Sequence, residues 1–538
     1  MWLASIGSPG RGRARVIQSG SRRLRVLALL AAAGLVAAGC GSSQHSTGGA
    51  AAASFNAKIG SLYYTDSLDP ALGESGGDYA YLNMIYDRLM TINSTTGALE
   101  PGLATSFKFQ GANNLQYAMT IRTGVKFQDG SALDAAAVKA SLQHFIAVQE
   151  VQVIPPSSIA SIDVTGKYSL VINLTKQFAS LPLLLADRAG MIVSPTALQK
   201  YGKSFAQHPV GAGPFSFVSQ VPQSSVTFKK FPGYWDAAQI KLSGATISYY
   251  PTDVSLYNAV QSGAVQVAED LPGSDLKPAK SNPNLTVASA PQTGFDNIFF
   301  NLGKKPLNNV DVRMAFNLAL NRPAIARLTT SGLGAVGTQP YAPSFPYYDP
   351  AVANSYAYNP ARARQLLAQA GFAKGVSFTC LYYPGAEYET AAPLIISDEA
   401  AVGIHLNVVS ESLSEAANAF NVAGTVPCLF ADWGSGYNAA ETMSQLFASN
   451  SYYNGGLQNK GKVNYGADNE IAALNSAVTL TQLKAGIGQV LTKVASNALW
   501  APLFFKPAFI VLTHSVHADG DINGDLGGNY RVLAPAGS

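Results

Sequence analysis

Residues 121–138 read IRTGVKFQDGSALDAAAV and contain the end of a strand, a turn and the start of a helix. In residues 115–121, apolar side chains alternate with polar or small ones, which is the period of a half-buried strand. Asp129-Gly130 supplies a turn, and Asp134 can cap a helix that carries apolar residues on one face. The stretch therefore predicts the strand–turn–helix unit of an α/β protein.

The second half of the chain predicts a further alternation of strands and helices. Asp311 can cap one helix, and Asn359-Pro360 opens another that ends at Gly371. From about residue 376 the pattern becomes β-α-β. Strands are expected at 376–383, 404–409 and 426–430, and helices at 387–402 and 482–497.

The composition excludes several classes of protein. Of the 538 residues, 47% are apolar and only 13% are charged, which is the opposite of an intrinsically disordered chain. Residues 1–40 contain six arginines and no acidic residue, and removing those six from the 36 basic residues leaves 30 against 32 acidic ones. The rest of the chain thus has a net charge of −2, which does not indicate a nucleic-acid partner.

The first 40 residues have the features of an export signal. Arginines precede an apolar run over residues 26–38 that is too short to span a membrane. The run ends in AAGC at 37–40, which resembles the lipobox of bacterial lipoproteins, where lipid is attached to the thiol of the Cys, here Cys40. We expect a signal peptide over 1–39 and a flexible tether over 40–54. An ordinary secretory leader with an incidental Cys is the alternative.

Nine short motifs follow one another in order through most of residues 55–515. They are SLDP (67–70), IYDRL (85–89), LEPGLATSF (99–107), the stretch 121–138, PVGAGPF (209–215), GYW (233–235), QSG (261–263), FN (300–301) and DVRMAF (311–316). As an ordered set they resemble the extracytoplasmic solute-binding proteins of ABC importers, specifically the peptide/nickel type called family 5.

The resemblance implies an α/β fold of two lobes, the type II or Venus-flytrap fold of periplasmic binding proteins. It places the first lobe at residues 55–295, with an extra subdomain at about 95–210. The second lobe is expected at 296–500, and a return to the first lobe at 501–538. A ligand that touches both lobes favours the closed arrangement, because it binds that arrangement more tightly.

Motifs of catalysis are weak in this sequence. Gly211-Ala212-Gly213 is followed by Pro214, which lacks an amide that a bound phosphate would need. The SxxK pattern at 274–277 lacks the companion KTG and SDN elements. His514 and His517 have no further metal ligand evident nearby, so a solvated strand edge is favoured. We expect a protein that is not an enzyme and needs no cofactor or metal ion.

Two cysteines, Cys380 and Cys428, remain besides Cys40. Both fall in predicted strands of the second lobe that the β-α-β order could make neighbours, and export permits a disulfide. Bridges between adjacent strands are geometrically constrained, which slightly favours two buried thiols. Both alternatives stay open at this point.

The resemblance also suggests which residues contact a ligand between the lobes. They are Tyr64, Ser67, Phe295, Trp433, Gly434, Ser435 and Tyr437. Aromatic faces suit sugars and flat ligands, and main-chain groups at Gly434 and Ser435 could bond an extended ligand. The alternative is that about half of the aromatic side chains belong to the core.

In the peptide binders of this family, an Asp shortly after a Trp in the second lobe pairs with the ligand's α-ammonium group. In the stretch DWGSGYN, residues 432–438, that position falls on Ser435 or Gly436. Asp432 could replace it only if its side chain faces the cleft, and strand alternation puts Asp432 and Trp433 on opposite faces. Because a desolvated ammonium without an anion is costly, we expect a less polar or uncharged cargo, such as a modified peptide, an oligosaccharide or a cofactor-like molecule.

These features together favour a lipid-anchored, monomeric receptor that delivers a peptide-like or other small solute to the permease of an ABC importer. It is expected outside the cytoplasm, on the outer face of the cytoplasmic membrane, held there by its lipid. The alternative keeps the fold but not transport: a lipoprotein that regulates or scaffolds assembly of the cell envelope through protein contacts.

Overall fold

The structure is a computed structural model, and the expected strand–turn–helix unit is present in it. β5 (Gln116–Ile121) precedes α2 (Ala135–Val148), and the Asp134 carboxylate accepts the first free N–H groups of that helix, from Ala136 and Ala137, each at 3.0 Å. The structure describes residues 55–65, 67–72, 76–149, 154–269, 271–289, 294–383, 386–434, 436, 438–451, 453, 466–506, 509–522 and 528–538.

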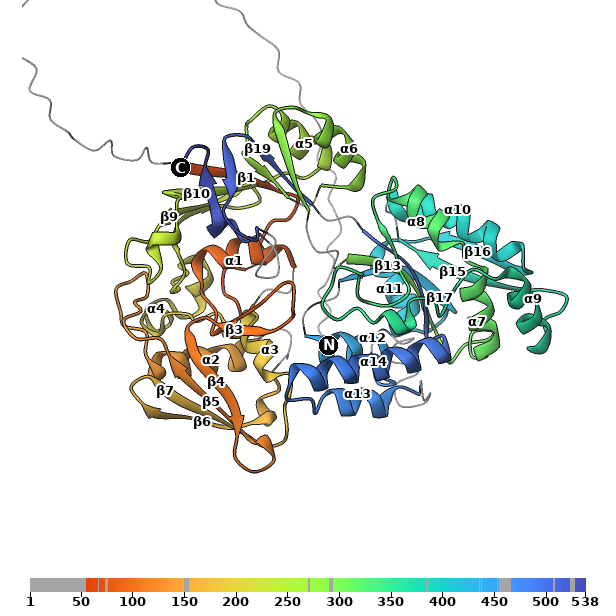
Figure 1. Cartoon of the computed structure of the whole chain (residues 1–538), viewed down its shortest axis with the longest axis horizontal. Coiled ribbons are helices and arrows are strands. Elements are labelled where there is room, and N and C mark those ends of the chain that lie inside the picture. The colour runs from red at the N-terminus through yellow and green to blue at the C-terminus, as the bar shows by residue number, and fades with distance from the viewer. Residues whose placement is uncertain are drawn as a thin grey trace, which may run out of the picture. The chain divides into compact units, whose positions relative to one another are not determined.

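The described residues form two large sheets, one smaller sheet and two short strand pairs (Figure 1). The seven-stranded sheet has the order β12 (Leu285–Ser289), β19 (Phe509–Thr513), β11 (Val267–Ala268), β1 (Asn56–Ser61), β10 (Gly244–Tyr249), β9 (Ser225–Lys230) and β8 (Phe215–Val221). The six-stranded sheet has the order β14 (Ala335–Val336), β18 (Trp500–Phe505), β13 (Gly294–Phe300), β17 (Cys428–Gly434), β15 (Val376–Tyr382) and β16 (Ile404–Ser410).

The smaller sheet lies within the segment expected to form an extra subdomain. Its order is β4 (Ala104–Gln110), β5, β7 (Ser169–Leu174) and β6 (Ile159–Gly166). The short pairs are β2 (Met90–Ile92) with β3 (Leu99–Pro101), and β20 (Val516–Ala518) with β21 (Leu533–Pro535). Helix α2 packs on β6 and β7, so this sheet has a core of its own.

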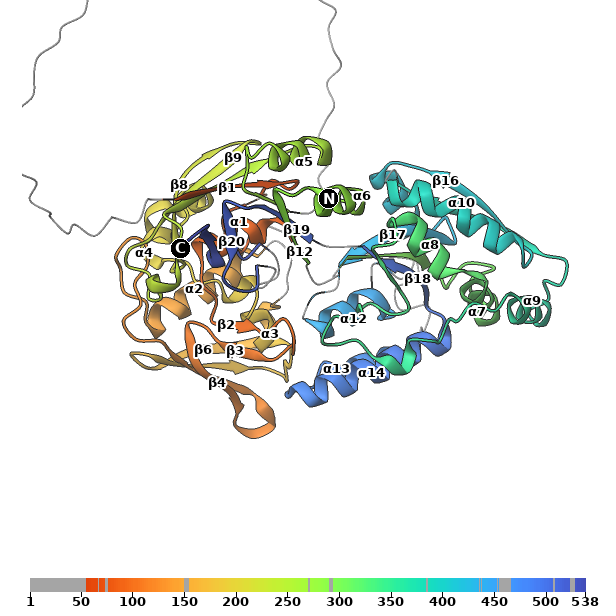
Figure 2. The ribbon, with the colours of Figure 1, turned by 45° about the horizontal axis from the view of Figure 1, so that its top comes forward.

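Helices accompany each sheet, as Figures 1 and 2 show. Those in the first half of the chain are α1 (Tyr79–Ile85), α2, α3 (Leu181–Leu185), α4 (Pro195–Tyr201), α5 (Asp253–Gln261) and α6 (Gly273–Ser281). Those in the second half are α7 (Val310–Ala319), α8 (Arg322–Thr329), α9 (Pro360–Gln369), α10 (Ala386–Ala400), α11 (Leu413–Ala417), α12 (Ala439–Phe447), α13 (Asp468–Leu474) and α14 (Leu480–Asn497). Helices α7 and α8 pack on β18, α10 packs on β16, and α12 and α13 pack on α14.

Most helix ends fall where the sequence predicts them, and one does not. Asn359 caps α9 by accepting the N–H of Arg362 at 3.0 Å, as expected. The expectation that Asp311 caps a helix is wrong, because Asn309 caps α7 and accepts the N–H of Asp311 at 2.8 Å. Asp311 lies in the first turn instead, where its negative charge still suits the positive end of the helix dipole.

Three of the sequence motifs are joined at one point by close backbone contact. A Cβ atom on Gly211 would lie 2.3 Å from the carbonyl oxygen of Ile85, so only glycine fits there. The Gln128 amide donates to the carbonyl oxygens of Ile85, at 2.7 Å, and Phe215, at 2.9 Å, and its oxygen accepts the N–H of Gly211 at 2.9 Å. The motifs at 85–89, 121–138 and 209–215 therefore serve the packing of the first lobe.

The chain passes between the two large sheets twice. It leaves the seven-stranded sheet at Ser289 and enters the other at Gly294, and it returns between Phe505 and Phe509. The Lys506 N–H donates to the Gly294 carbonyl at 3.0 Å, so the two passages are bonded where they meet the six-stranded sheet. The expected lobe boundaries, 295/296 and 500/501, lie a few residues inside that sheet.

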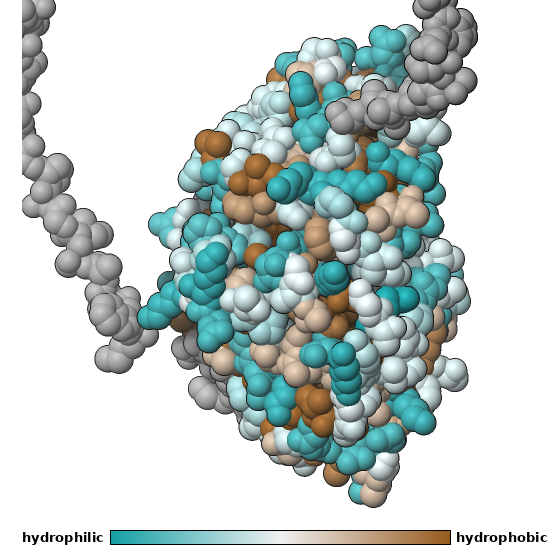
Figure 3. Space-filling model, turned by 90° about the vertical axis from the view of Figure 1, so that its left-hand side faces the viewer, coloured by the Kyte–Doolittle hydropathy of each residue, from teal (hydrophilic) through white to brown (hydrophobic). Residues whose placement is uncertain are grey.

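The surface of the described residues is mixed in character. One face interleaves hydrophilic and hydrophobic residues (Figure 3). Among the helices that the structure describes, none combines the length and apolar character needed to cross a membrane.

Candidate functional site

The carboxyl ends of the parallel strands in the seven-stranded sheet lie where the chain passes to the other sheet. β1 runs parallel to β10 and β11, and β11 and β12 are both antiparallel to β19. The residues that follow β1 and β10 therefore share an edge with the passage after β12. In open α/β sheets this edge is where ligands bind.

The six-stranded sheet presents the matching edge. β17 and β18 are both antiparallel to β13, and β15 is parallel to β17. The carboxyl ends of β15, β17 and β18 thus meet at the start of β13, where the chain arrives from the other sheet. Side chains that follow these strands are the candidates for contact with a ligand.

A group of charged and phenolic side chains lies at this edge, and we call Asp296, Tyr383, Glu387, Tyr388, Asp432 and Lys506 the Lys506 cluster. Lys506 Nζ lies 3.3 Å from Asp432 Oδ2 and 3.7 Å from Asp296 Oδ2. The Tyr383 hydroxyl donates to Asp432 Oδ1 and lies 3.2 Å from the Tyr388 hydroxyl. Asp296 is only 1% exposed, whereas the side chain of Asp432 is 47% exposed, so one lysine joins a buried carboxyl group to one that faces solvent.

The pKa values of the two carboxyl groups are shifted in opposite directions. Burial raises the pKa of Asp296 to about 7, with Asp432 and Glu387 adding to the rise and Lys506 opposing it. Although Asp432 is partly desolvated, Lys506 and the Tyr383 hydroxyl hold its pKa below the ordinary value. Burial lowers the pKa of Lys506, but the nearby carboxylates outweigh it and raise the net value. Asp432 and Lys506 are therefore both charged near neutral pH.

Tyrosines lie at the facing edge of the seven-stranded sheet. The side chain of Tyr63 is 49% exposed, and its carbonyl accepts the Tyr81 hydroxyl at 2.9 Å. The Tyr64 ring makes edge contacts with the rings of Tyr81 and Tyr249, with centroids 6.3 Å and 6.1 Å apart, and its hydroxyl accepts from the Gln220 amide at 2.7 Å. This edge therefore offers aromatic surface, and the other edge offers charge.

The family profile described as bacterial extracellular solute-binding proteins, family 5 Middle, matches residues 98–455, which is more than half of the chain. The chain belongs to this family. This family 5 solute-binding protein is 29% identical over 433 residues to the glutathione-binding protein GsiB of Salmonella paratyphi A, over 76% of this chain and 80% of the relative.

Solved structures resemble this family 5 solute-binding protein over almost their whole length. HbpA2 from Haemophilus parasuis superimposes with a TM-score of 0.77 at 20% identity, covering 89% of this chain and 99% of that one. The ABC transporter-associated periplasmic binding protein DppA from Helicobacter pylori, in complex with the peptide STSA, gives 0.72 at 20% identity, with coverage of 90% and 98%. The expected fold class is confirmed, and so is membership of a family of extracellular solute-binding proteins.

The structure places the sequence-predicted site residues of the first lobe in different settings. Tyr64 lies at the carboxyl edge of β1, half-buried among other tyrosines. The Ser67 hydroxyl accepts the N–H of Asp69 at 3.0 Å, so it is engaged in a local turn.

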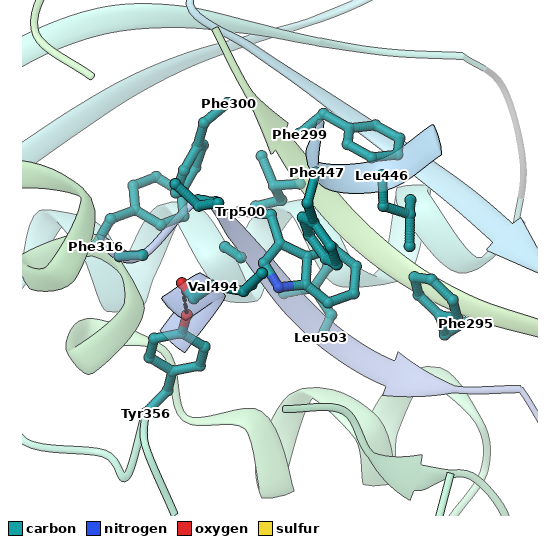
Figure 4. Close-up of a cluster of buried hydrophobic side chains, with 14 of the residues drawn as sticks. Phe295, Phe299, Phe300, Phe316, Tyr356, Leu446, Phe447, Val494, Trp500 and Leu503 are labelled. Carbon is teal, nitrogen blue, oxygen red and sulfur yellow. Dashed lines mark hydrogen bonds between the residues drawn. The ribbon is translucent and has the colours of Figure 1, made fainter. Parts of the chain in front are cut away.

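In the six-stranded sheet, Phe295 is 1% exposed and packs edge-on against Trp500, with ring centroids 5.3 Å apart (Figure 4). It also packs against Phe505, with ring centroids 5.9 Å apart. Its ring belongs to the core, so the structure corrects its expected place among the ligand contacts. Trp433 is half-buried against Tyr453, and Gly434 is exposed, with open space where a side chain would project. Ser435 and Tyr437 lie outside the described residues, as does Cys40.

Cys380 and Cys428 form a disulfide, with their Cα atoms 4.7 Å apart. Of the two alternatives left open from the sequence, the slight preference for thiols is the wrong one. The two residues are direct register partners on the parallel strands β15 and β17, and both are fully buried. Their separation lies within the range that a disulfide spans.

Asp87 holds the C-terminal segment to the first lobe. It accepts from Arg531 at 2.8 Å, from the Trp235 indole at 2.7 Å and from the Tyr234 hydroxyl at 3.4 Å. These residues line a cavity of about 270 Å³. The contacts also explain two sequence motifs, because Asp87 belongs to IYDRL and its two aromatic partners belong to GYW.

His514 and His517 lie near each other in the sequence, just after β19 and in the short strand β20. His517 Nε2 is 2.9 Å from Asp519 Oδ1, and both side chains are exposed. Within the described ranges, no group of three or more His, Cys, Asp or Glu side chains is arranged to hold a metal ion.

Sequence reasoning missed Lys506, Asp296 and Tyr383. Tyr383 and Lys506 each follow a strand, and Asp296 lies near the start of one, at the edge where the chain changes sheet. This position is the signal that could have indicated them. Using that signal requires the strand order, because 210 positions separate Asp296 from Lys506 in the sequence.

Proposed function

We propose that this family 5 solute-binding protein captures a peptide-like solute, or another small oligomeric one, between the carboxyl edges of its two large sheets. It acts as a monomer and delivers the solute to the permease of an ABC importer. One observation carries the proposal: the carboxyl edges of both large sheets lie where the chain passes between the sheets. Tyrosines lie on one edge and the Lys506 cluster lies on the other.

The relatives support a solute that contains peptide bonds. GsiB is named as a glutathione-binding protein, and DppA was solved with a peptide bound. Tyrosine rings and exposed main chain at Gly434 suit an extended backbone, because they make few demands on its side chains. We infer that the protein makes and breaks no covalent bond in this cycle, as is usual in a family of binding proteins.

We further propose that the lobes divide where the chain passes between the large sheets, after Ser289 and after Phe505. We also propose that Cys40 carries the lipid that anchors the mature chain. The anchor is tested by expressing Cys40→Ser in a bacterial host. We expect wild-type protein in the membrane fraction and the variant in the soluble extracytoplasmic fraction or still joined to its leader. Equal release of both proteins would contradict the anchor without affecting the binding function.

The binding function is tested by thermal unfolding with a panel of glutathione, tripeptides, N-acetylated tripeptides and oligosaccharides. A ligand at 100 times its Kd should stabilise the protein by about 2.7 kcal/mol. Asp432→Ala and Tyr63→Ala should lose the response, because they alter the two facing edges. Asp163→Ala, on the four-stranded sheet, is the matched control and should keep it. Loss in the control as well, or no response to any compound, would contradict the proposal.

A further inference from the structure

We propose that Lys506 determines which solutes the site accepts. Its ammonium group already pairs with the Asp432 carboxylate. The site therefore selects solutes whose end at this edge is uncharged or acylated over solutes with a free α-ammonium group. This inference rests on the proposed function and specifies the chemical class of its solute. It follows from four features of the Lys506 cluster.

First, both oxygens of the Asp432 carboxylate have partners within the protein. Oδ1 accepts from the Tyr383 hydroxyl, and Oδ2 lies 3.3 Å from Lys506 Nζ. Asp432 also donates its own N–H to the Tyr383 hydroxyl at 3.2 Å, which fixes the carboxylate relative to the ring. A ligand therefore meets a carboxylate that is positioned and already neutralised.

Second, Lys506, which follows β18, also contacts groups on the neighbouring strand β13. Its Nζ lies 3.7 Å from the Asp296 carboxyl, which is 1% exposed, and its N–H donates to the Gly294 carbonyl at 3.0 Å. If the ammonium group turned out to solvent, the buried Asp296 would lose its nearby cation and take up a proton, so the ion pair would be lost. The two carboxyl groups and the backbone bond therefore favour the position of Lys506 beside Asp432.

Third, the position of Lys506 opposes a second cation. An α-ammonium bound to Asp432 would come within a few ångströms of the Lys506 ammonium, and like charges at that separation repel. Glu387, a further acidic member of the cluster, offsets part of this repulsion. The net effect is a weaker hold on free amino termini.

Fourth, Lys506 has donor capacity for an uncharged group. An ammonium group carries three N–H donors, of which one donates to Asp432 Oδ2 at 3.3 Å. The Asp296 carboxyl, at 3.7 Å, lies within ion-pair distance but accepts no hydrogen bond from it. The Lys506 side chain is 30% exposed, so a further donor can reach solvent. A carbonyl oxygen, such as that of an acetyl or other acyl group, accepts such a bond without adding charge.

The test measures the ratio of acylated to free peptide that the protein retains. Wild type, Lys506→Met and Lys506→Met/Asp432→Asn are each dialysed against an equimolar mixture of a tripeptide library and the same library N-acetylated, and the retained members are quantified by mass spectrometry. Lys484→Met, an exposed lysine on α14, is the matched control for loss of one positive charge. Thermal unfolding checks that each variant is folded, and Lys506→Gln replaces the methionine variant if that one is not.

We expect wild type and Lys484→Met to retain mainly acetylated peptides, and Lys506→Met to shift the ratio at least about ten-fold toward free peptides. The double variant should lose that gain, because free amino termini then lack their anion. A ratio that favours free peptides in wild type and does not change in Lys506→Met would overturn the inference while leaving the binding function intact. No retention of either library by any variant would overturn the inference together with the proposed peptide-like cargo.

Discussion

Cys380 and Cys428 are register partners on two neighbouring parallel strands, and the disulfide between them joins β15 to β17 inside the six-stranded sheet. Both residues are fully buried, and 48 positions separate them in the sequence. A crosslink of this span restricts the unfolded chain and links two strands that a long β-α-β segment connects.

Removing the disulfide should therefore destabilise the protein. We expect Cys380→Ala/Cys428→Ala to lower the free energy of unfolding by about 2–4 kcal/mol, measured by urea denaturation. Wild type in reducing buffer should approach the stability of the variant. Two free thiols in the denatured, unreduced wild type would contradict the bond.

The close approach of Gly211 to Ile85 predicts a strict requirement for glycine. In Gly211→Ala the new Cβ would lie 2.3 Å from the Ile85 carbonyl oxygen, so the backbone must shift. We expect a loss of roughly 2 kcal/mol or more in the free energy of unfolding. Gly294→Ala is the control, because nothing lies within 4 Å of its Cβ, and its change should stay within about 1 kcal/mol. Equal losses in both variants would show that the Ile85 contact is not the cause.

A buried carboxyl group on α10 predicts a variant that gains stability. Glu399 is fully buried, and neither of its carboxyl oxygens has a hydrogen-bond partner among the described residues. Nearby Arg322 instead donates to Asn317, Tyr356 and Pro502. Burial raises the pKa of Glu399 well above its ordinary value, although Arg322 opposes the rise.

Because the pKa of this acid is raised on folding, its contribution to stability is complete below the unfolded pKa and is lost as the pH rises. Glu399→Gln, which stays neutral, should therefore be more stable than wild type at pH 8 by about 1–3 kcal/mol. The difference should shrink toward pH 4. Glu389→Gln, at an exposed position on the same helix, is the matched control for the loss of one carboxyl group. A constant difference between Glu399→Gln and wild type across this range would contradict the assignment.

Asp296 gives a second pH dependence with a defined window. Since burial raises its pKa to about 7, wild type should lose stability relative to Asp296→Asn between about pH 4 and pH 7, and little more above it. The total should be roughly a few kcal/mol, since the pKa of about 7 already includes the attraction of Lys506. Urea midpoints at pH 4.5, 6 and 8 measure it. Parallel curves for the two proteins would mean that Asp296 titrates normally.

Local features of the fold were predictable from the sequence. The capping of α2 by Asp134 and of α9 by Asn359 depends on residues within one helical turn, and both predictions are confirmed. The cap of α7 lies two residues before the predicted one, because Asn309 and Asp311 are both good capping residues and only the path of the preceding chain selects between them.

Features that depend on strand order were not predictable in the same way. The disulfide requires Cys380 and Cys428 to be in register, and no local pattern fixes that register. The Lys506 cluster combines side chains from the ends of β13, β15, β17 and β18, whose proximity follows only from the order of the sheet. The core position of Phe295 also depends on this order, because its ring packs against Trp500 and Phe505 on the neighbouring strand.

The most direct test of the account is amide hydrogen exchange, followed by mass spectrometry, with and without the solute that stabilises the protein most. If the solute binds between the two carboxyl edges, protection should rise in peptides that contain Tyr63 and in those that contain Asp432 and Lys506, while α2 and the four-stranded sheet stay unchanged. Protection confined to one lobe, or to the segments around Asp87 and Arg531 that line the 270 Å³ cavity, would contradict it.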